Sequence, residues 1–456
     1  MLFSRFIFLI YVLFLIAIAP SKLDGSFFFG IKPSFFLGLL SFFLSYSLIY
    51  ALSLKFNMSL KKGFVFVSEL LLLACFLINL FLLGSQRIFF TNFSLFPAVV
   101  LFSTFFIFLY FLGLFFIHYL DFRLKSGSQE NNEALDKKAY AHGLHQILLF
   151  LPLILPFFFL LFFFHLLSFL LEDDLTDSKA LLALLAILPI FIICFPWFVQ
   201  KAWCAYSLES YGEPSLVEHL NQICERASFK HGGLKVWTAL DRAPTAAIIG
   251  TYHKFRYILF TKKLLNSLSD NALGAVLAHE IGHCKKGHLF FIPFVFSGMF
   301  LLGFLFSLFI HPSLYNYFLQ FFNPLLGSLA ESASDLAIVL IYLLLFALYF
   351  RFIFGFYIRL YEREADLYGQ SISVSPRHLI NALNTIGILG GNIHSKPSWH
   401  HYSIEIRNQI LEQSIVDPNL GFNHSKKVKK WNLVYVFSFF LLLTLGFAGI
   451  KLTNFL

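Results

Sequence analysis

The chain of 456 residues alternates long apolar runs with shorter polar stretches. A run of on the order of 20 apolar residues is long enough to cross the hydrocarbon core of a bilayer as a helix. Nine such runs occur, at about 4–20, 35–54, 64–84, 95–117, 145–171, 180–199, 289–310, 335–357 and 431–450. The pattern therefore predicts a mostly α-helical, polytopic membrane protein with about nine spans.

The first run ends in AIAP, whose small residues are typical of a cleaved secretory signal. A proline stands at the junction where cleavage would occur, and further spans follow. We therefore expect an uncleaved anchor.

The basic residues of the short loops predict the orientation, because cytoplasmic loops are enriched in Lys and Arg. The loop at 55–63 carries three lysines and the loop at 118–144 carries four basic residues. By contrast, 172–179 reads EDDLTDSK and 311–334 has no Lys or Arg. The alternation has one exception, Lys22 and Lys32, which fall on the predicted outer side.

This orientation places two polar segments, 200–288 and 358–430, on the same cytoplasmic face. We expect them to be the two halves of one domain, separated by a transmembrane hairpin at 289–357. The predicted order is completed by N-terminal transmembrane helices at 1–117, a cytoplasmic polar loop at 118–144, a transmembrane helix pair at 145–199 and a C-terminal transmembrane helix at 431–456.

Composition excludes several classes of protein. The chain is 58% hydrophobic and 13% charged, which is too apolar for a soluble globule throughout. The net charge of +9 lies in loops between spans, so it indicates membrane topology and no nucleic-acid partner. The five cysteines contain no C-x-x-C pair, which argues against a disulfide framework or a thiolate zinc site.

Within 200–288, the sequence predicts a small sheet followed by a helix. LKVWTAL and FRYILFT are rich in β-formers, and TAAIIGTYHKF between them reads as a strand with a turn at Gly250. In SLSDNALGAVLAHEIGHCKKGH, apolar residues recur at helical spacing, Ser269 or Asp270 can cap the start, and Gly287 can end the helix.

The candidate chemistry lies on that helix, in HEIGH. Residues four apart share a helix face, so His279 and His283 can direct ring nitrogens at one ion while Glu280 reaches a water beside it. Chance alone would supply roughly 0.02 such motifs in this chain. The spacing fits zinc, with Glu280 as the general base of a hydrolase.

A catalytic zinc usually has three protein ligands, and RLYEREADLYG supplies a candidate. Glu362 and Asp366 are one helical turn apart on a single face. Glu362 can bind the metal while Asp366 hydrogen-bonds a ligand histidine. Glu364 falls on the other side of the helix, and we expect its replacement to be nearly silent.

The chain contains HEIGHCKKGH, then a two-span hairpin and then ExxAD. This order of motifs resembles the membrane-integrated gluzincin peptidases, a family that includes CAAX prenyl protease 1 and the HtpX heat-shock proteases. The strand, loop and helix before HEIGH, and HHYSIEIR after it, are similar to further family motifs. The resemblance implies a small α+β zincin-like catalytic domain at the cytoplasmic face, one Zn²⁺ per chain, and a polypeptide substrate.

The resemblance also implies roles for residues outside HEIGH. His401 would stabilise the oxyanion, and Arg407 would contact substrate as part of the same signature. The strand at Thr245, Ala246 and Ala247 would pair with an extended substrate.

The chain departs from the family at three positions: Thr245 replaces Asn, Tyr402 replaces Pro, and Cys284 stands where the prenyl-protease branch often has Trp. The candidate ligands and base are all present, so Thr245 bears on substrate binding and not on zinc. Cys284 points away from the ligand face, and we expect it to be a packing residue. His288, past the helix-ending Gly287, is expected to be structural.

The predicted function is a zinc endopeptidase acting on membrane-associated, lipidated or misfolded membrane proteins. In a bacterium it would lie in the inner membrane. An intramembrane protease of the site-2 type is disfavoured, because Lys285 and Lys286 would be costly inside a bilayer and the LDG at 23–25 precedes HEIGH. The remaining alternative is a non-catalytic scaffold or transporter-like protein that retains the helix, against which the intact Glu280 argues.

Overall fold

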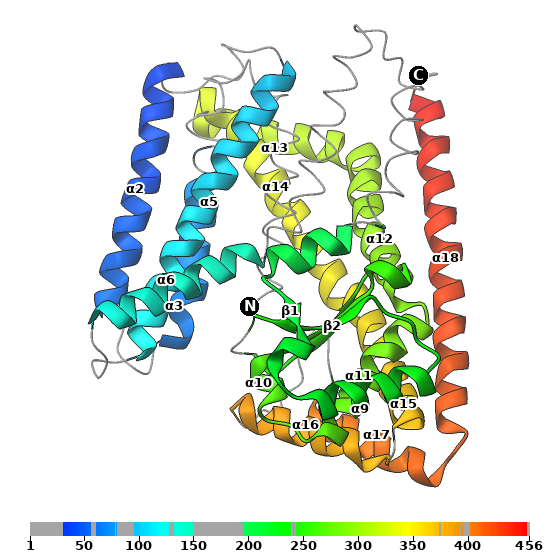
Figure 1. Cartoon of the computed structure of the whole chain (residues 1–456). Coiled ribbons are helices and arrows are strands. Elements are labelled where there is room, and N and C mark those ends of the chain that lie inside the picture. The colour runs from blue at the N-terminus through cyan, green and yellow to red at the C-terminus, as the bar shows by residue number, and fades with distance from the viewer. Residues whose placement is uncertain are drawn as a thin grey trace, which may run out of the picture. The chain divides into compact units, whose positions relative to one another are not determined.

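The structure is a computed structural model that describes residues 31–55, 61–77, 79, 95–126, 132–149, 193, 195–238, 240, 243–373, 375–391, 394–395 and 402–453. It divides into two compact units, Met1–Leu184 with Pro312–Leu343 and Leu185–His311 with Leu344–Leu456. Each unit is built from segments far apart in the sequence (Figure 1).

The described part of the first unit is helical. Its helices are α2 (Ile31–Lys55), α3 (Lys61–Leu77), α5 (Leu95–Ser126), α6 (Asn132–Leu148), α13 (His311–Leu326) and, up to Leu343, α14 (Ala330–Leu348). Helices α2, α3 and α5 pack against one another. The Tyr46 hydroxyl of α2 donates a hydrogen bond of 2.6 Å to the carbonyl of Leu109 on α5.

Four described helices are long and apolar enough to cross a membrane: Pro33–Ser53, His288–Phe309, Ala333–Ile372 and Leu420–Gly449. They coincide with four of the nine predicted spans. The spans expected at 4–20, 145–171 and 180–199 lie wholly or mostly outside the described residues. The count of nine therefore stays a prediction.

Two segments expected to be loops contain helices. Helix α6 lies in and beyond the polar stretch 118–144, and its Leu135 and Ala139 pack with Phe122 of α5. Residues four apart share a helix face, so this apolar pair gives α6 a packed side although the helix is polar on average. Helix α13 occupies much of 311–334.

The second unit contains a four-stranded sheet with the order β1-β2-β4-β3. Strands β2 (Gly233–Trp237) and β4 (Tyr257–Thr261) are parallel, whereas β3 (Ala246–Ile249) pairs with β4 antiparallel. The predicted strands and the turn at Gly250, where φ is +96°, are confirmed. The pattern did not predict the two-residue strand β1 (Tyr206–Ser207), which is too short to show a periodicity.

The core of this unit lies between the sheet and two helices. Helix α9 (Pro214–Arg226) buries Leu216, Leu220 and Ile223, which follow helical spacing. Helix α11 (Asp270–Lys285) is buried almost all round from Ala272 to Ile281. It begins after Ser269, as predicted, although the Ser269 side chain makes no capping hydrogen bond. A helix buried on all sides holds its polar residues in fixed positions.

Helix α15 (Gly355–Ile372) packs along α11 (Figure 1). Two glycines mark the crossing. A Cβ at Gly369 would lie 2.8 Å from the amide nitrogen of His279, and one at Gly282 would lie 3.1 Å from the Cα of Ala365. The two backbones therefore approach more closely than side chains at these positions would allow.

Three further helices pack against α15. Helix α15 contacts α16 (Arg377–Leu389), α17 (Ile404–Val416) and α18 (Leu420–Thr453). Helix α18 also packs along α12 (His288–Phe309), and a π-helical turn at Tyr349–Phe354 leads into α15. The helix carrying EREAD is therefore enclosed by elements from several parts of the chain.

We predict that Gly369→Ala lowers stability by about 1–3 kcal/mol, because the added methyl group must push α11 and α15 apart. The measurement is the thermal unfolding midpoint of the purified chain in detergent. Gly421→Ala on α18 is the control, because the nearest heavy atom to a Cβ there is 3.9 Å away. Equal midpoints for the two variants would contradict a tight crossing.

Candidate metal centre

Two histidines of α11 face the same point. The Nε2 atoms of His279 and His283 are 3.3 Å apart, one turn apart on the helix. His279 is buried and the His283 side chain is 14% exposed. The four-residue spacing predicted from HEIGH therefore brings the two rings together.

Helix α15 adds a carboxylate to this pair. The Glu362 oxygens lie 3.4 Å from His283 Nε2 and 3.7 Å from His279 Nε2. One ligand atom from each of the three residues falls within 4.8 Å of the others.

These separations fit a metal. Four tetrahedral ligands at about 2.0–2.1 Å from a zinc ion lie about 3.3–3.4 Å from one another. Two imidazole nitrogens and one carboxylate oxygen are also a donor set that zinc accepts in catalytic sites. The three residues therefore fit Zn²⁺ by both chemistry and spacing.

The other ring nitrogen of His279 faces a buried ion pair. Nδ1 lies 2.9 Å from Asp366 Oδ1. Arg407 of α17 donates to both Asp366 oxygens, from Nε at 2.8 Å and from Nη2 at 2.6 Å. Burial disfavours the charged guanidinium, but the Asp366 charge outweighs this and raises the pKa of Arg407. Arg407 therefore stays cationic and holds Asp366 as a carboxylate.

The other ring nitrogen of His283 faces a second chain of polar side chains. Its Nδ1 is 3.1 Å from Nδ1 of His288, and His288 Nε2 is 3.0 Å from Glu364 Oε2. Ser425 of α18 donates to the other oxygen of Glu364, and Lys286 Nζ lies 3.7 Å from it. His288 is fully buried and stacks on the ring of Tyr361.

Glu364 has more partners than its place on the far side of α15 indicated when its replacement was expected to be nearly silent. The residue does lie away from Glu362 on α15, but it is only 5% exposed and is bonded by side chains of α12 and α18. Helical spacing within α15 identified the opposite face, but could not show that two other helices cover it. His288, which was expected to be structural, contacts the candidate metal ligand His283 directly.

Glu280 is partly exposed and follows His279 on α11. Burial disfavours the charged form of His283, but the nearby carboxylates of Glu362 and Glu280 outweigh it and raise the pKa of His283. Glu280 is therefore close enough for its charge to raise the pKa of His283, and it remains partly exposed to solvent.

The residues expected to bind substrate lie in two places. Thr245, Ala246 and Ala247 are at β3, which ends the strand order and packs against α11. The backbone of Thr245 pairs with Thr261 of β4. Arg407 is elsewhere: its guanidinium is occupied by Asp366 and not turned to the strand.

Two other expectations concern His401 and Cys284. His401 lies outside the described residues. Cys284 packs against the core between the sheet and α11, and burial raises the pKa of its thiol to about 12. A thiol of that pKa is protonated near neutral pH, which agrees with a packing role.

Comparisons with known proteins assign this region to a family. Residues 212–412 match the model of peptidase family M48. A Protease HtpX homolog from Bordetella petrii is 29% identical over 77 residues, which cover 17% of this chain and 25% of that protein. The chain thus spans about a quarter of that relative's length in the match.

Among solved structures, the crystal structure of S. mikatae Ste24p matches with a TM-score of 0.45 and 14% identity, covering 88% of this chain and 99% of that one. The segment matched by the family model contains all three candidate metal ligands, Glu280 and the Asp366–Arg407 pair. The segment that carries the candidate site is therefore similar to peptidase family M48.

Proposed function

We propose that the protein is a zinc-dependent endopeptidase that hydrolyses peptide bonds of membrane-associated proteins. The observation that carries the proposal is the convergence of His279, His283 and Glu362 beside a partly exposed Glu280, within the segment that matches the peptidase family. A purely structural metal site has no need of an adjacent carboxylate base.

His279, His283 and Glu362 would hold the zinc, which when bound lowers the pKa of a water molecule and polarises a carbonyl group. Glu280 accepts the proton of the attacking water and returns it to the leaving amine. Because its side chain is partly exposed, both water and a peptide can reach it. His401 is proposed to stabilise the oxyanion.

Asp366 and Arg407 are proposed to act through His279. A carboxylate that accepts from Nδ1–H leaves Nε2 of His279 with its lone pair directed at the metal. Arg407 keeps Asp366 ionised and oriented by two hydrogen bonds. We therefore propose that Arg407 is a positioning residue, in place of the substrate contact expected from the sequence.

His288 and Glu364 are proposed to do the same for His283. An ionised Glu364 can only accept, so the 3.0 Å contact puts a proton on His288 Nε2. Neutral His288 then has a free acceptor at Nδ1, which receives the Nδ1–H of His283. Nε2 of His283 is again left unprotonated for the metal.

The substrate is proposed to bind as an extended strand along β3. The strand at Thr245, Ala246 and Ala247 lies next to α11. The backbone of Thr245 is bonded to Thr261 of β4, so the neighbouring Ala246 offers its backbone groups at the other edge for the substrate. Main-chain hydrogen bonds select an extended conformation and not a particular sequence. Lipidated or misfolded membrane proteins are the proposed substrate class, and the cytoplasmic side the proposed location of the site.

Glu280→Gln is predicted to abolish peptidase activity while leaving about one zinc per chain, because the amide cannot accept a proton and the ligands are untouched. Peptidase assays and metal analysis of the purified chain measure both. A non-catalytic scaffold would show no change in function, and unchanged proteolysis would overturn the proposal.

Glu362→Ala is predicted to abolish activity and to lower zinc retention sharply, because it removes a ligand. Asp366→Ala leaves all three ligands and is predicted to cost roughly 10–100-fold in zinc affinity or activity. Chelator competition on the purified variants gives the affinities. A Glu362→Ala protein that binds zinc like the unmodified chain would show that the third ligand lies elsewhere.

His288→Phe is predicted to weaken zinc binding roughly 10–100-fold, because His283 loses the acceptor that fixes its tautomer. Phenylalanine can keep the stacking on Tyr361. The matched variant is Glu364→Gln, whose amide oxygen can still accept from His288 and should retain most of the affinity. Equal losses in both variants, or none in either, would contradict the proposed hydrogen-bond direction.

A further inference from the structure

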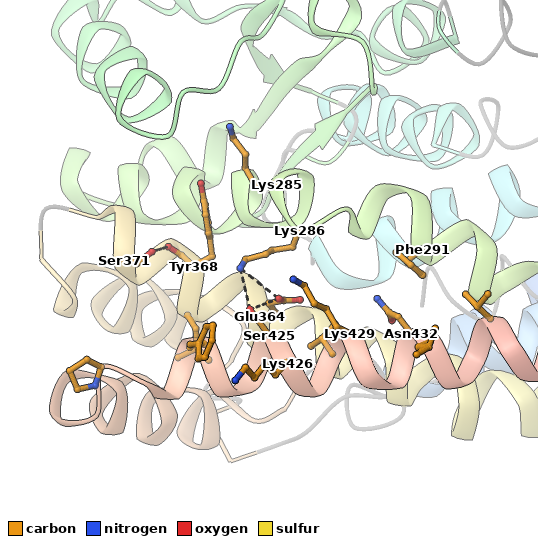
Figure 2. A pocket seen from close by; sticks show the side chains of 17 residues that line it. Lys285, Lys286, Phe291, Glu364, Tyr368, Ser371, Ser425, Lys426, Lys429 and Asn432 are labelled. Carbon is orange, nitrogen blue, oxygen red and sulfur yellow. Dashed lines mark hydrogen bonds and ion pairs between the residues drawn. The ribbon is translucent and has the colours of Figure 1, made fainter.

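A cavity of about 820 Å³ lies beside the polar chain that ends at Glu364. Its walls come from the end of α11, the start of α12, and from α15 and α18 (Figure 2). None of the candidate metal ligands lines it. The cavity is therefore a separate compartment from the proposed active site.

One end of the cavity is basic. Lys285, Lys286, Lys426 and Lys429 line it, and Glu364 is the single carboxylate among the lining residues. Lys286 lies 3.7 Å from Glu364 and donates to Ser425, but four lysines against one carboxylate still leave the cavity with a positive balance. Figure 2 shows the ammonium groups of Lys286 and Lys429 turned towards the same space.

Asn432 adds a buried donor at this end. The residue is 8% exposed, and its side-chain oxygen accepts a hydrogen bond of 2.7 Å from the hydroxyl of Tyr361. The amide nitrogen is thereby turned towards the cavity (Figure 2), and among the described residues it has no hydrogen-bond acceptor. An N–H group that faces a cavity without a protein acceptor can donate to an oxygen of a bound ligand.

The other side of the cavity is apolar. Phe291 of α12 and Leu433 and Val436 of α18 line it, and both helices are candidate membrane spans. Leu433 is 71% exposed. The lining thus changes from lysines to hydrocarbon within the N-terminal halves of two candidate spans, as the bilayer does from headgroups to acyl chains.

We propose that this cavity binds an anionic phospholipid, with its phosphate held by Lys286, Lys429 and the Asn432 amide and its acyl chains along Phe291 and Leu433. A phosphate diester offers several acceptor oxygens and a negative charge to these donors. A free phosphate ion would use the donors but leave the apolar wall in water. The choline of a zwitterionic lipid would place a cation among the lysines.

The test is native mass spectrometry of the full chain in detergent, titrated with phosphatidylglycerol and, separately, with phosphatidylcholine. We expect phosphatidylglycerol to bind at one preferred site and phosphatidylcholine to bind more weakly. Lys429→Gln should weaken phosphatidylglycerol binding about five-fold, the effect of one lysine near a membrane surface.

Lys430→Gln is the matched control, because Lys430 follows on the same helix but does not line the cavity. It should leave the affinity unchanged. Asn432→Asp keeps an oxygen for Tyr361 and replaces the donor by a carboxylate, so it should weaken binding at least as much as Lys429→Gln. Thermal midpoint and zinc content should stay unchanged in Lys429→Gln and Lys430→Gln.

Three results would overturn the inference. Equal losses in Lys429→Gln and Lys430→Gln would show a general effect of surface charge. Equal affinities for the two lipids would remove the requirement for an anionic headgroup. Displacement of phosphatidylglycerol by inorganic phosphate at equal concentration would show that the site binds phosphate without the acyl chains.

Discussion

The close crossing of α11 and α15 is the contact on which the candidate site depends. His279 and His283 come from one helix and Glu362 from the other. The distances from the Glu362 oxygens to the two histidine rings therefore depend on how closely the two backbones approach. Gly282 and Gly369 permit that approach, because a Cβ at either position would press on the opposite backbone.

Each candidate ligand histidine is linked to a different buried carboxylate on the side away from the candidate metal position. Asp366 faces His279 and is tied to Arg407 of α17, while Glu364 reaches His283 through His288 and is tied to Ser425 of α18. Buried charges are tolerated only when paired and hydrogen-bonded, so both carboxylates also require the helices that supply their partners. The same polar networks thus orient the rings and join α17 and α18 to the metal centre.

The sequence predicted those parts of the site that depend on spacing within one helix. The four-residue repeats in HEIGH and EREAD correctly placed His279 with His283, and Glu362 with Asp366, on common faces. The role of Glu364 could not be read in this way, because its partner Ser425 is 61 residues away and approaches from another helix. Arg407 was associated with substrate by resemblance, and only the fold shows that Asp366 occupies its guanidinium.

Secondary structure was likewise predicted where the pattern within one element was strong. Three strands and α11 were predicted from local periodicity, whereas α6 was missed because two apolar residues on a polar helix give a weak pattern. Helix α9 repeats leucine at four-residue spacing and could have been found.

The proposed metal centre is defined by the atoms that surround a bound zinc ion. X-ray absorption at the zinc edge of the purified full chain, loaded with one equivalent of Zn²⁺, measures this without reference to activity. If His279, His283 and Glu362 bind the ion, the spectrum will show two imidazoles and oxygen ligands at about 2.0–2.2 Å from the zinc. A sulfur scatterer at about 2.3 Å, which would require Cys284 or another thiolate, or the absence of imidazole scattering, would contradict that ligand set.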